Sequence, residues 1–508
     1  MPGKYIFYDL ETTGKGKKES SNSFGSSPKW EQILQIAAIV VDENFQPTNQ
    51  NMNIFCRPRV SIIAQPGALL TTNRGIKESL NANLSSYQLV SSINRTFELW
   101  IKENPESIFI GHNSMNFDET VLEYNLFSNL YYPYLTRKKR GDTINLARGL
   151  YAANSSLIKT DITAKGRPSF KLEKLAEFNN LPVESAHDAF SDVKTSIALA
   201  KFIKEADITI WESLIFTMDK QKAAEHITNN SGITHLTNWG GKINLEALSM
   251  VCESQVYKGM FHTLKLSNDP LPLLEASNSE FKEILGKKPS VNRWLTTNNH
   301  PIFLDNKLAI NYKPNNEIGS EILNARKKII YKNKSLADKF RMYEIDRQLE
   351  KEDSLSQDNI FPESKANTFF EFKEQNIFQN FHSINDWNEK YKIALSVKDP
   401  SANFILKRLI FDESPQTLSE DDFKKTHKEL SERLLLNQER PFTTIPEAMT
   451  LVDTERSRIE DENNDDKEKN MQILDEYNKY LEFLENYFSD RNAAPLKTGD
   501  ELIKQIYN

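Results

Sequence analysis

Cysteine is almost absent from this chain of 508 residues, which contains only Cys56 and Cys252, far apart in sequence. Two such cysteines exclude a disulfide scaffold and a cysteine-based zinc module. Long apolar runs are also lacking, because the longest, residues 33–41, is interrupted by Gln35 and is far too short to span a bilayer. No charged-then-apolar signal region precedes the first strand-like segment. We therefore expect a cytoplasmic protein that makes no contact with a membrane.

An excess of basic residues is missing as well, since 64 Lys and Arg face 71 Asp and Glu and give a net charge of −7. This balance argues against a bulk polyanion binder, so any nucleic-acid site must be a local basic groove. Hydrophobic residues make up 38% of the chain and include 29 Phe and 17 Tyr, which excludes a wholly disordered protein. The length predicts roughly three to four domains.

The first 205 residues have the pattern of an α/β domain. Strand-like apolar runs alternate with segments of helical periodicity, the runs at 5–8, 33–41 and 108–110 and the helical segments at 119–130, 171–178 and after Asp188. This interleaving predicts a sheet with helices packed on its faces. Residues 14–29, rich in Gly, Ser and Lys, are predicted to form a surface loop.

The pattern changes twice after residue 205. Residues 206–355 are predicted to contain short strands and turns, with a strand pair at 249–257 and 260–266 and a linker at 350–359. Residues 356–508 are predicted to be helical. Their clearest features are long amphipathic helices at 418–436 and 471–488, with a solvated charged loop at 460–469.

The first candidate motif is Phe7-Tyr8-Asp9-Leu10-Glu11-Thr12-Thr13-Gly14, at the end of the first strand. Side chains two residues apart on a strand point to the same face, so Asp9 and Glu11 project together. Adjacent carboxylates repel each other unless a cation lies between them, and hard divalent cations such as Mg²⁺ or Mn²⁺ prefer oxygen ligands. The alternative is that both acids mark a solvated strand end.

Two further motifs lie at the start of helices. Asp118 follows the turn Gly111-His112-Asn113, where an acid also suits any helix N-terminus. His187 and Asp192 are five residues apart, so an imidazole and a carboxylate can meet at one site. Histidine is the side chain best suited to take a proton from water near neutral pH, although a surface helix with an idle His and Asp is the alternative. Together, four acids and one histidine in this order are what a two-metal phosphodiester hydrolase needs.

These five residues resemble the DEDD exonuclease superfamily, in its histidine-bearing subclass. The resemblance extends to the segments 65–71, 117–134 and 168–173. It implies an α/β fold with a ribonuclease H-like mixed sheet and flanking helices over 1–205. It also implies an SH3-like β domain over 206–355 and a C-terminal α-helical domain over 356–508, which enclose a groove for the nucleic acid.

The resemblance also implies residue roles. Two Mg²⁺ ions, for which Mn²⁺ can substitute, would be held by Asp9, Glu11, Asp118 and Asp192, and His187 would be the general base. Substrate contacts would come from Glu11 and from three residues further along the chain, Lys171, Arg148 and Tyr134. Lys171 stands where the family usually has Arg, and Glu123 stands where a basic residue is expected.

The implied activity is 3′→5′ degradation of single-stranded DNA to 5′-mononucleotides, in DNA repair or recombination. We expect a monomer, with single-stranded-DNA-binding protein as a candidate partner. An exoribonuclease and a catalytically inactive single-strand-binding scaffold are the alternatives, and the intact catalytic set argues against the latter. The tyrosines 131, 132 and 134 before the basic run 137–140 fit a single-strand groove, or equally a buried aromatic helix end followed by a solvated loop. The basic stretch 326–341 is better explained as a solvated helix face than as a groove wall.

Overall fold

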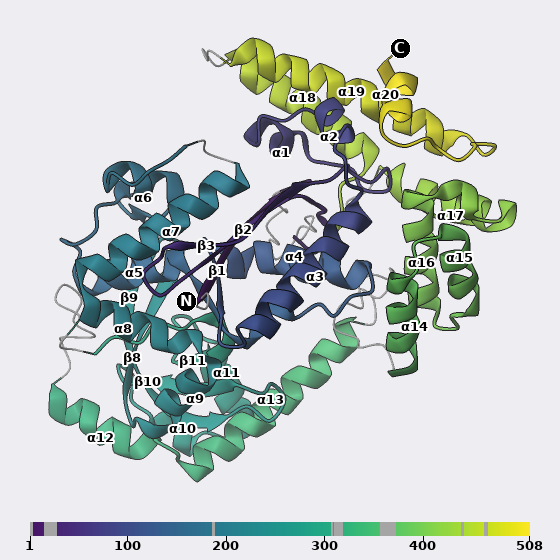
Figure 1. Cartoon of the computed structure of the whole chain (residues 1–508). Helices are drawn as coiled ribbons and strands as arrows, with labels where there is room; N and C mark the ends of the chain where they lie inside the picture. The colour runs from purple at the N-terminus through teal and green to yellow at the C-terminus, as the bar shows by residue number, and fades with distance from the viewer. Residues whose placement is uncertain are drawn as a thin grey trace.

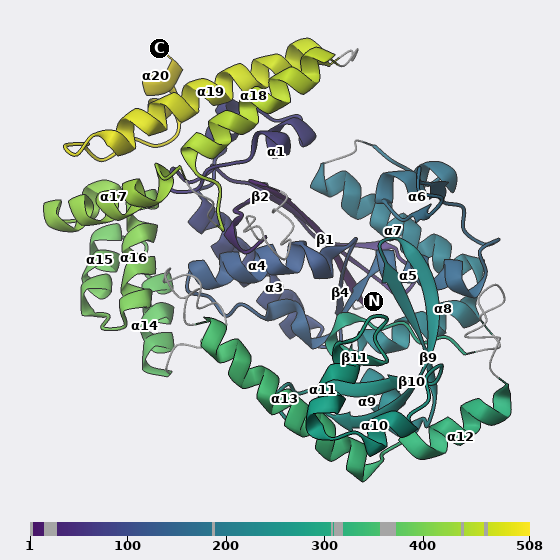
Figure 2. The same ribbon diagram turned by 180° about the vertical axis from the view of Figure 1, so that it is seen from behind.

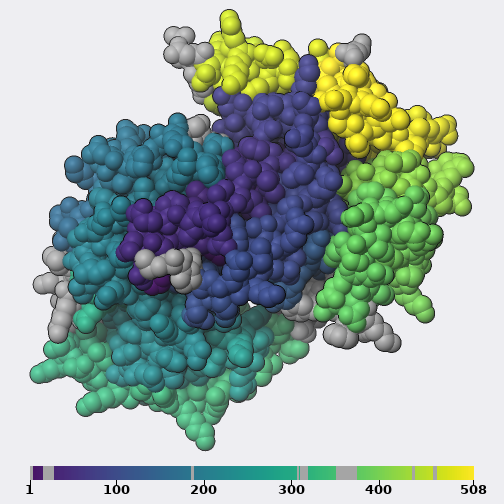
Figure 3. All heavy atoms as spheres, in the orientation of Figure 1, coloured from purple at the N-terminus to yellow at the C-terminus, as the bar shows by residue number. Residues whose placement is uncertain are grey.

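A computed structural model describes residues 4–14, 28–184, 188–305, 308, 319–355, 372–437, 441–461 and 466–507. The chain forms three regions, which Figures 1 and 2 show from opposite sides. A mixed sheet with its helices lies at the centre, a small antiparallel sheet with helices lies beside it, and a set of helices covers another side. In the space-filling view of Figure 3, the amino-terminal residues occupy the middle, between the second region and the carboxy-terminal helices.

The central sheet has five strands in the order β3-β2-β1-β4-β5. Strands β1 (Tyr5–Thr12), β2 (Ile33–Val41) and β3 (Pro47–Phe55) pair antiparallel, whereas β4 (Ile108–Gly111) and β5 (Arg140–Asp142) extend the sheet in parallel from β1. This mixed, ribonuclease H-like sheet is the one that the sequence predicted. The strand β3 escaped prediction because it is a polar edge strand in which Met52 alone is buried.

Helices cover both faces of the sheet because β1 and β2 are apolar on both faces. One face packs Tyr5 and Phe7 against α5 (Thr143–Ala153), α7 (Ala189–Ala206) and α8 (Ile208–Ile215). The other packs Ile6 and Tyr8 against α3 (Ser86–Glu103) and α4 (Asp118–Ser128). Shorter elements complete the region, namely α1 (Pro66–Thr71), α2 (Ile76–Leu80), β6 (Asp161–Ile162), β7 (Pro168–Ser169) and α6 (Leu172–Phe178).

The second region is a four-stranded antiparallel sheet in the order β11-β10-β9-β8. Its strands are β8 (Ile233–Trp239), β9 (Lys242–Glu253), β10 (Met260–Lys265) and β11 (Asn292–Thr296). The predicted strand pair is confirmed, although its first strand begins earlier and ends at Glu253. Five helices accompany this sheet, α9 (Lys220–Asn229), which contributes Ile227 to its core, α10 (Leu271–Glu275), α11 (Asn278–Gly286), α12 (Ser320–Ile330) and α13 (Lys334–Leu355). The predicted linker at 350–359 is wrong over 350–355, which continue α13, and its remainder lies outside the described residues.

The third region is helical, as predicted. It comprises α14 (Phe372–Ser383), α15 (Trp387–Ser396), α16 (Pro400–Glu413), α17 (Glu420–Leu434), α18 (Ile445–Asp461), α19 (Lys467–Ser489) and α20 (Asp500–Tyr507). The predicted loop 460–469 is shorter than expected, because α18 reaches Asp461 and α19 begins at Lys467, with 462–465 outside the description. These helices share one apolar core with Leu69, Ile76 and Tyr87 of the first region, so they pack firmly against it.

The structure describes only part of the surface loop predicted at residues 14–29. Residues 15–27 of the predicted loop lie outside the described residues, and 28–30 form a short 3₁₀ helix, η1 (Pro28–Trp30).

Across the parts of the chain that are described, no helix combines the length and apolarity needed to cross a membrane.

Candidate active site

The site is built on β1 and on the helix that packs against it. Asp9 and Glu11 continue the face of β1 to which Tyr5 and Phe7 belong, and α7 packs over that face. Asp192 lies in the first turn of α7. Three carboxylate oxygens, one each from Asp9, Glu11 and Asp192, therefore lie within 4.8 Å of one another. Residues from two distant parts of the sequence thus meet in one half-buried group.

Asp118 reaches the same neighbourhood from the opposite side of β1. It is buried at the N-terminus of α4, and its Oδ1 accepts a hydrogen bond of 3.2 Å from the backbone N–H of Leu10. Asp118 is not a member of the three-residue group, but after burial its charge is the largest cause of the raised pKa of Asp9. The structure thus brings all four predicted acids to the carboxyl end of β1.

Burial and mutual repulsion make the ionised form of this acidic cluster energetically unfavourable. Burial raises the pKa of Asp9 well above its ordinary value, and the charges of Asp118, Glu11 and Asp192 raise it further. Burial likewise raises the pKa of Asp118 to about 7. Desolvated carboxylates side by side favour protonation unless a cation balances them. Four oxygen-donor acids suit a hard divalent cation.

Asp188 holds the start of α7 in place, a role that sequence reasoning did not assign. As the N-cap, it accepts a 3.1 Å hydrogen bond from the backbone N–H of Ser191 and a 3.0 Å bond from Nε2 of Gln35 on β2. The helix is thereby tied to the sheet one turn before Asp192. Its place directly before an apolar helical pattern was a capping signal that could have been recognised. His187, immediately before it, lies outside the described residues, so its role stays a prediction.

Asp142, which sequence reasoning also missed, shapes the turn that leads to Asp118. It is buried at the end of β5 and accepts backbone hydrogen bonds from Asn113, Met115 and Ile144. Burial raises its pKa to about 6. The available signal was an acid placed between a strand and the helix α5, which is the usual position of an N-cap.

His112 is a positioning group and not a free base. Its ring nitrogens lie 2.9 Å from Oγ1 of Thr143 and 2.9 Å from the carbonyl oxygen of Phe170. Because the carbonyl can only accept, Nε2 donates to it and Nδ1 accepts from the Thr143 hydroxyl. Burial lowers the pKa of His112 to about 4, so the ring is neutral at pH 7. It joins β4 to the segment that ends at Lys171.

Two of the predicted substrate residues lie around that segment. Lys171 is the N-cap of α6, with an exposed ammonium group 3.6 Å from Glu173. The guanidinium of Arg148 on α5 lies 5.8 Å from the centre of the Phe170 ring, and burial lowers its pKa. Lys171 and Arg148 thus flank Phe170, whose carbonyl oxygen is held by the hydrogen bond from His112.

Tyr134 and the basic run after it are largely engaged within the protein. Arg137 lies 4.1 Å over the Tyr134 ring and donates to Glu123 at 2.7 Å, so the unexpected acid at 123 is neutralised. Arg140 is buried and pairs with Glu119, and Lys139 lies 3.2 Å from Asp219. The solvated-loop interpretation of 137–140 is therefore wrong in detail, because intramolecular ion pairs hold most of these charges.

The first region and the whole chain both have known counterparts. Residues 6–200 match the RNase_T exonuclease family. Exodeoxyribonuclease I of Escherichia coli (strain K12) is 26% identical over 291 residues, which cover 55% of this chain and 58% of that protein. The Haemophilus influenzae exodeoxyribonuclease I is 28% identical over 225 residues, 44% of this chain and 46% of that one. The first region thus matches an exonuclease family model, and the sequence relatives are exodeoxyribonucleases I that are 26–28% identical over the matched segments.

The sequence matches to these two curated relatives span only about half of each relative's length. Comparison with solved exonuclease I structures extends the shared fold to the remaining regions. E. coli exonuclease I in complex with a dA16 oligonucleotide superimposes with a TM-score of 0.75 at 20% identity, over 94% of this chain and 99% of that one. A moderately thermophilic exonuclease I from Methylocaldum szegediense gives a TM-score of 0.77 at 18% identity, with the same coverage. The exonuclease I fold thus includes the second sheet and the carboxy-terminal helices.

Proposed function

We propose that this chain is a 3′→5′ exonuclease that degrades single-stranded DNA to 5′-mononucleotides by two-metal phosphodiester hydrolysis. The observation that carries the proposal is the convergence of carboxylate oxygens from Asp9, Glu11 and Asp192 within 4.8 Å, in a domain of the RNase_T exonuclease family. The buried Asp118 completes an acidic set that is unfavourable without counter-cations.

Two Mg²⁺ ions, for which Mn²⁺ can substitute, fit this set because every donor is a hard carboxylate oxygen. Asp9, Glu11, Asp118 and Asp192 would hold them. When bound, such cations activate water and stabilise the leaving 3′ oxygen. His187 would take the proton from that water, and its place beside Asp188, which anchors α7, supports this role.

The substrate contacts are proposed from the geometry around α6. The exposed ammonium of Lys171 suits a phosphate at the 3′ end of the strand, where the family usually has the bidentate Arg. Arg148, beside Phe170, and Glu11 would contact the terminal nucleotide, and Tyr134 would line the path of the strand. We assign the three domains to residues 1–205, 206–355 and 356–508.

Relatives support the choice of partners. One E. coli exonuclease I structure is a complex with a dA16 oligonucleotide, and another solved structure is an ExoI/SSB-Ct complex. We infer that this chain likewise binds single-stranded DNA and the single-stranded-DNA-binding protein, as a cytoplasmic monomer in DNA repair or recombination.

A time course on labelled substrates tests the activity. The substrates are 5′-labelled single-stranded DNA, the duplex, and RNA of the same sequence, each with and without Mg²⁺. We expect a 3′→5′ ladder on single-stranded DNA alone, which depends on the cation. Faster degradation of RNA than of DNA would favour the exoribonuclease instead.

Matched variants test the site. Asp192→Asn should reduce hydrolysis to the level of the metal-free reaction while strand binding is kept, because a metal ligand is lost. Asp421→Asn, which removes an exposed acid from the first turn of α17, is the control and should retain full activity. Near-normal turnover in Asp192→Asn would refute the two-metal assignment.

A further inference from the structure

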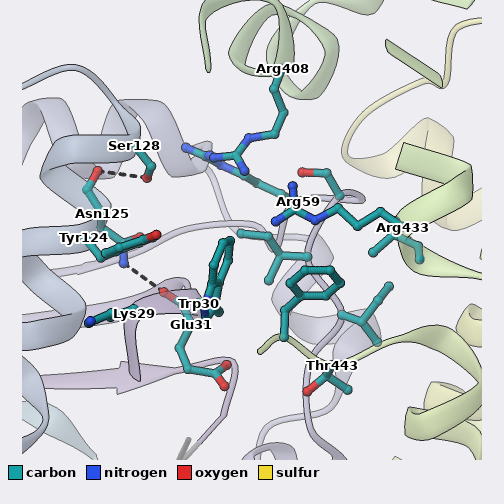
Figure 4. Close-up of a pocket in the computed structure, with 15 residues that line it drawn as sticks. Lys29, Trp30, Glu31, Arg59, Tyr124, Asn125, Ser128, Arg408, Arg433 and Thr443 are labelled. Carbon is teal, nitrogen blue, oxygen red and sulfur yellow. Dashed lines mark hydrogen bonds between the residues drawn. The ribbon is translucent and has the colours of Figure 1, made fainter. Parts of the chain in front are cut away.

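Glu31 is a buried carboxylate that the proposed chemistry does not use. It is 4% exposed and lies between η1 and β2, where the exonuclease domain meets the carboxy-terminal helices (Figure 4). Its backbone carbonyl accepts a 2.9 Å hydrogen bond from Nδ2 of Asn125 on α4, and Oδ1 of Asn125 accepts a 3.3 Å bond from the backbone N–H of Ile33. Helix α4 therefore fixes the backbone of Glu31 and the start of β2.

The side chain of Glu31 holds Thr13, the second residue after Glu11. Oγ1 of Thr13 donates to Oε2 of Glu31 at 2.7 Å and accepts from the backbone N–H of Gln32 at 2.9 Å. A hydroxyl has a single proton, so its donation to Glu31 leaves a lone pair for Gln32. The backbone N–H of Thr13 donates to the Gln32 carbonyl at 3.0 Å, and Thr13 is fully buried. The carboxylate thus fixes the orientation of the Thr13 hydroxyl and its pairing with Gln32.

Gly14 lies directly against the same carboxylate. A Cβ atom at Gly14 would lie 2.6 Å from Oε2 of Glu31 and 2.7 Å from the side chain of Gln65, which is closer than non-bonded atoms approach. The backbone N–H of Gln65 also donates to the Thr13 carbonyl at 2.7 Å. The chain that leaves β1 is therefore held between Glu31 and Gln65.

This held segment directly follows a metal-site residue. Strand β1 is irregular after Glu11, because Glu11 lies opposite Gln35 whereas Thr12 lies opposite Ile33. Irregularities of this kind re-aim the side chains beside them. The contacts of Thr13 determine how the strand ends after the irregularity, and with it the direction in which the Glu11 carboxylate points.

The carboxy-terminal region closes the far side of Glu31. Nε2 of Gln65 lies 3.4 Å from Oε1 of Glu31 and 3.5 Å from Oγ1 of Thr443, which is 4% exposed and lies just before α18. Thr443 and Glu31 line one small pocket between the two regions (Figure 4). Packing of the third region thus keeps Glu31 away from solvent and against Thr13.

We propose that Glu31 is a positioning residue, which acts through Thr13 to keep the Glu11 carboxylate in place beside Asp9 and Asp192. The inference rests on the proposed function, because it assumes that these carboxylates bind divalent cations. Hydrogen bonds that orient metal ligands from outside commonly contribute about 10–100-fold to metal affinity or activity. A carboxylate is costly to bury, so an apolar side chain at position 31 would serve stability equally well. The contribution specific to Glu31 is the direction that it gives to the end of β1.

Mn²⁺ binding to the full chain tests the proposal without nucleic acid. Isothermal titration calorimetry is done on the metal-free protein. We expect Thr13→Val, which keeps the shape of the side chain and removes its hydroxyl, to weaken Mn²⁺ binding by about tenfold or more. Glu31→Leu should weaken it by a similar factor, and the double variant should be no weaker than either single one, because both remove the same hydrogen bond. Thr13→Ser, which keeps the hydroxyl, should bind Mn²⁺ as the parent chain does.

Ser254→Ala is the matched control for stability. It also removes a buried hydrogen bond between a hydroxyl and a carboxylate, that of Ser254 to Glu344, but in the second sheet. Its Tm should fall as that of Thr13→Val does, whereas its Mn²⁺ affinity should equal that of the parent chain. If Glu31→Leu fails to fold, Thr13→Val still tests the proposal.

Kinetics on single-stranded DNA give a second readout. Thr13→Val should lower kcat by about tenfold or more with KM unchanged, and a higher Mg²⁺ concentration should restore part of the rate. Equal Mn²⁺ affinity in Thr13→Val and the parent chain would overturn the positioning role, as would equal losses in Thr13→Ser and Thr13→Val. A parent chain that binds Mn²⁺ but degrades no DNA would refute the proposed activity and leave the positioning role intact. A parent chain that binds no Mn²⁺ would refute the metal site and the positioning role together.

Discussion

At the scale of single residues, the acidic cluster lowers the stability of the folded protein and at the same time provides the carboxylate oxygens that the proposed chemistry needs. The pKa of Asp9 is raised by burial first and then by four neighbouring carboxylates, so its charged form is disfavoured in the folded protein. A cation compensates this cost, which links metal binding to folding.

We predict that Asp9→Asn stabilises the metal-free protein while it abolishes hydrolysis. The amide removes a repelling charge, and each unit of a raised pKa corresponds to about 1.4 kcal/mol. Tm measured in EDTA at pH 8 should rise, whereas added Mn²⁺ should raise Tm less than it does in the parent chain. A lower Tm in EDTA would contradict the electrostatic account.

Lys171 gives a second prediction at this scale. Lys171→Ala should raise KM for single-stranded DNA about tenfold with a smaller effect on kcat, because a phosphate contact is lost. Lys171→Arg should preserve KM. Lys174→Ala is the control, since Lys174 lies on the same helix and pairs with Glu177. An equal effect of both alanine variants would remove Lys171 from the substrate path.

At the scale of elements, α14 is attached to the first region through a neutral histidine. One ring nitrogen of His382 lies 3.2 Å from the carbonyl of Leu130 and the other 2.9 Å from the hydroxyl of Tyr87, and the ring stacks on Tyr131 at 3.8 Å. Lys390 donates to the same Tyr87 hydroxyl at 3.0 Å. Burial lowers the pKa of His382 to about 4. A protonated ring could no longer accept from the Tyr87 hydroxyl, and its positive charge would lie near Lys390.

The lowered pKa of His382 determines whether folding stability rises or falls with pH. Between the ordinary pKa of about 6.5 and the folded value of about 4, the unfolded chain binds more protons at His382 than the folded chain does. Stability from this group is therefore complete above pH 6.5 and is lost as the pH falls toward 4. We predict that His382→Gln, which cannot be protonated, loses about 1–3 kcal/mol less between pH 7 and 4.5 in denaturant titrations. Identical pH profiles would exclude this role.

At the scale of the whole molecule, an acidic chain has to hold a polyanion by local charge. The net charge is −7, and several conspicuous cations, such as Arg137 and Arg140, are paired internally. Under the proposed function, binding of single-stranded DNA depends on exposed cations such as Lys171.

We predict a correspondingly moderate salt dependence. The slope of the logarithm of affinity against the logarithm of salt concentration is about −0.7 for each phosphate neutralised on a single strand. Lys171→Ala should reduce its magnitude by about 0.7, as measured by fluorescence anisotropy in EDTA so that the strand stays intact. An unchanged slope would show that Lys171 does not contact phosphate.

Much of the site could be predicted from sequence because its parts are local patterns. Strand β2 occupies the predicted residues 33–41, and α6 and α7 begin within one residue of prediction, since apolar periodicity reports which face is buried. The pairing of Asp9 and Glu11 on one face followed from strand geometry alone. By contrast, β3 and the last turns of α13 carry little apolar signal, and their neighbours determine their structure.

The sequence by itself therefore determined the acidic motifs, the alternation of strands and helices in the first region, and the kind of chemistry that the motifs support. Only the tertiary structure decided which groups meet: Asp118 with Leu10, His112 with Phe170, and Arg59 with Asp412, residues that are 108, 58 and 353 positions apart. The physical reason is the distance along the chain over which each effect acts. Periodicity and capping act over a few residues, whereas burial, ion pairing and the resulting pKa shifts depend on packing between segments that are distant along the chain.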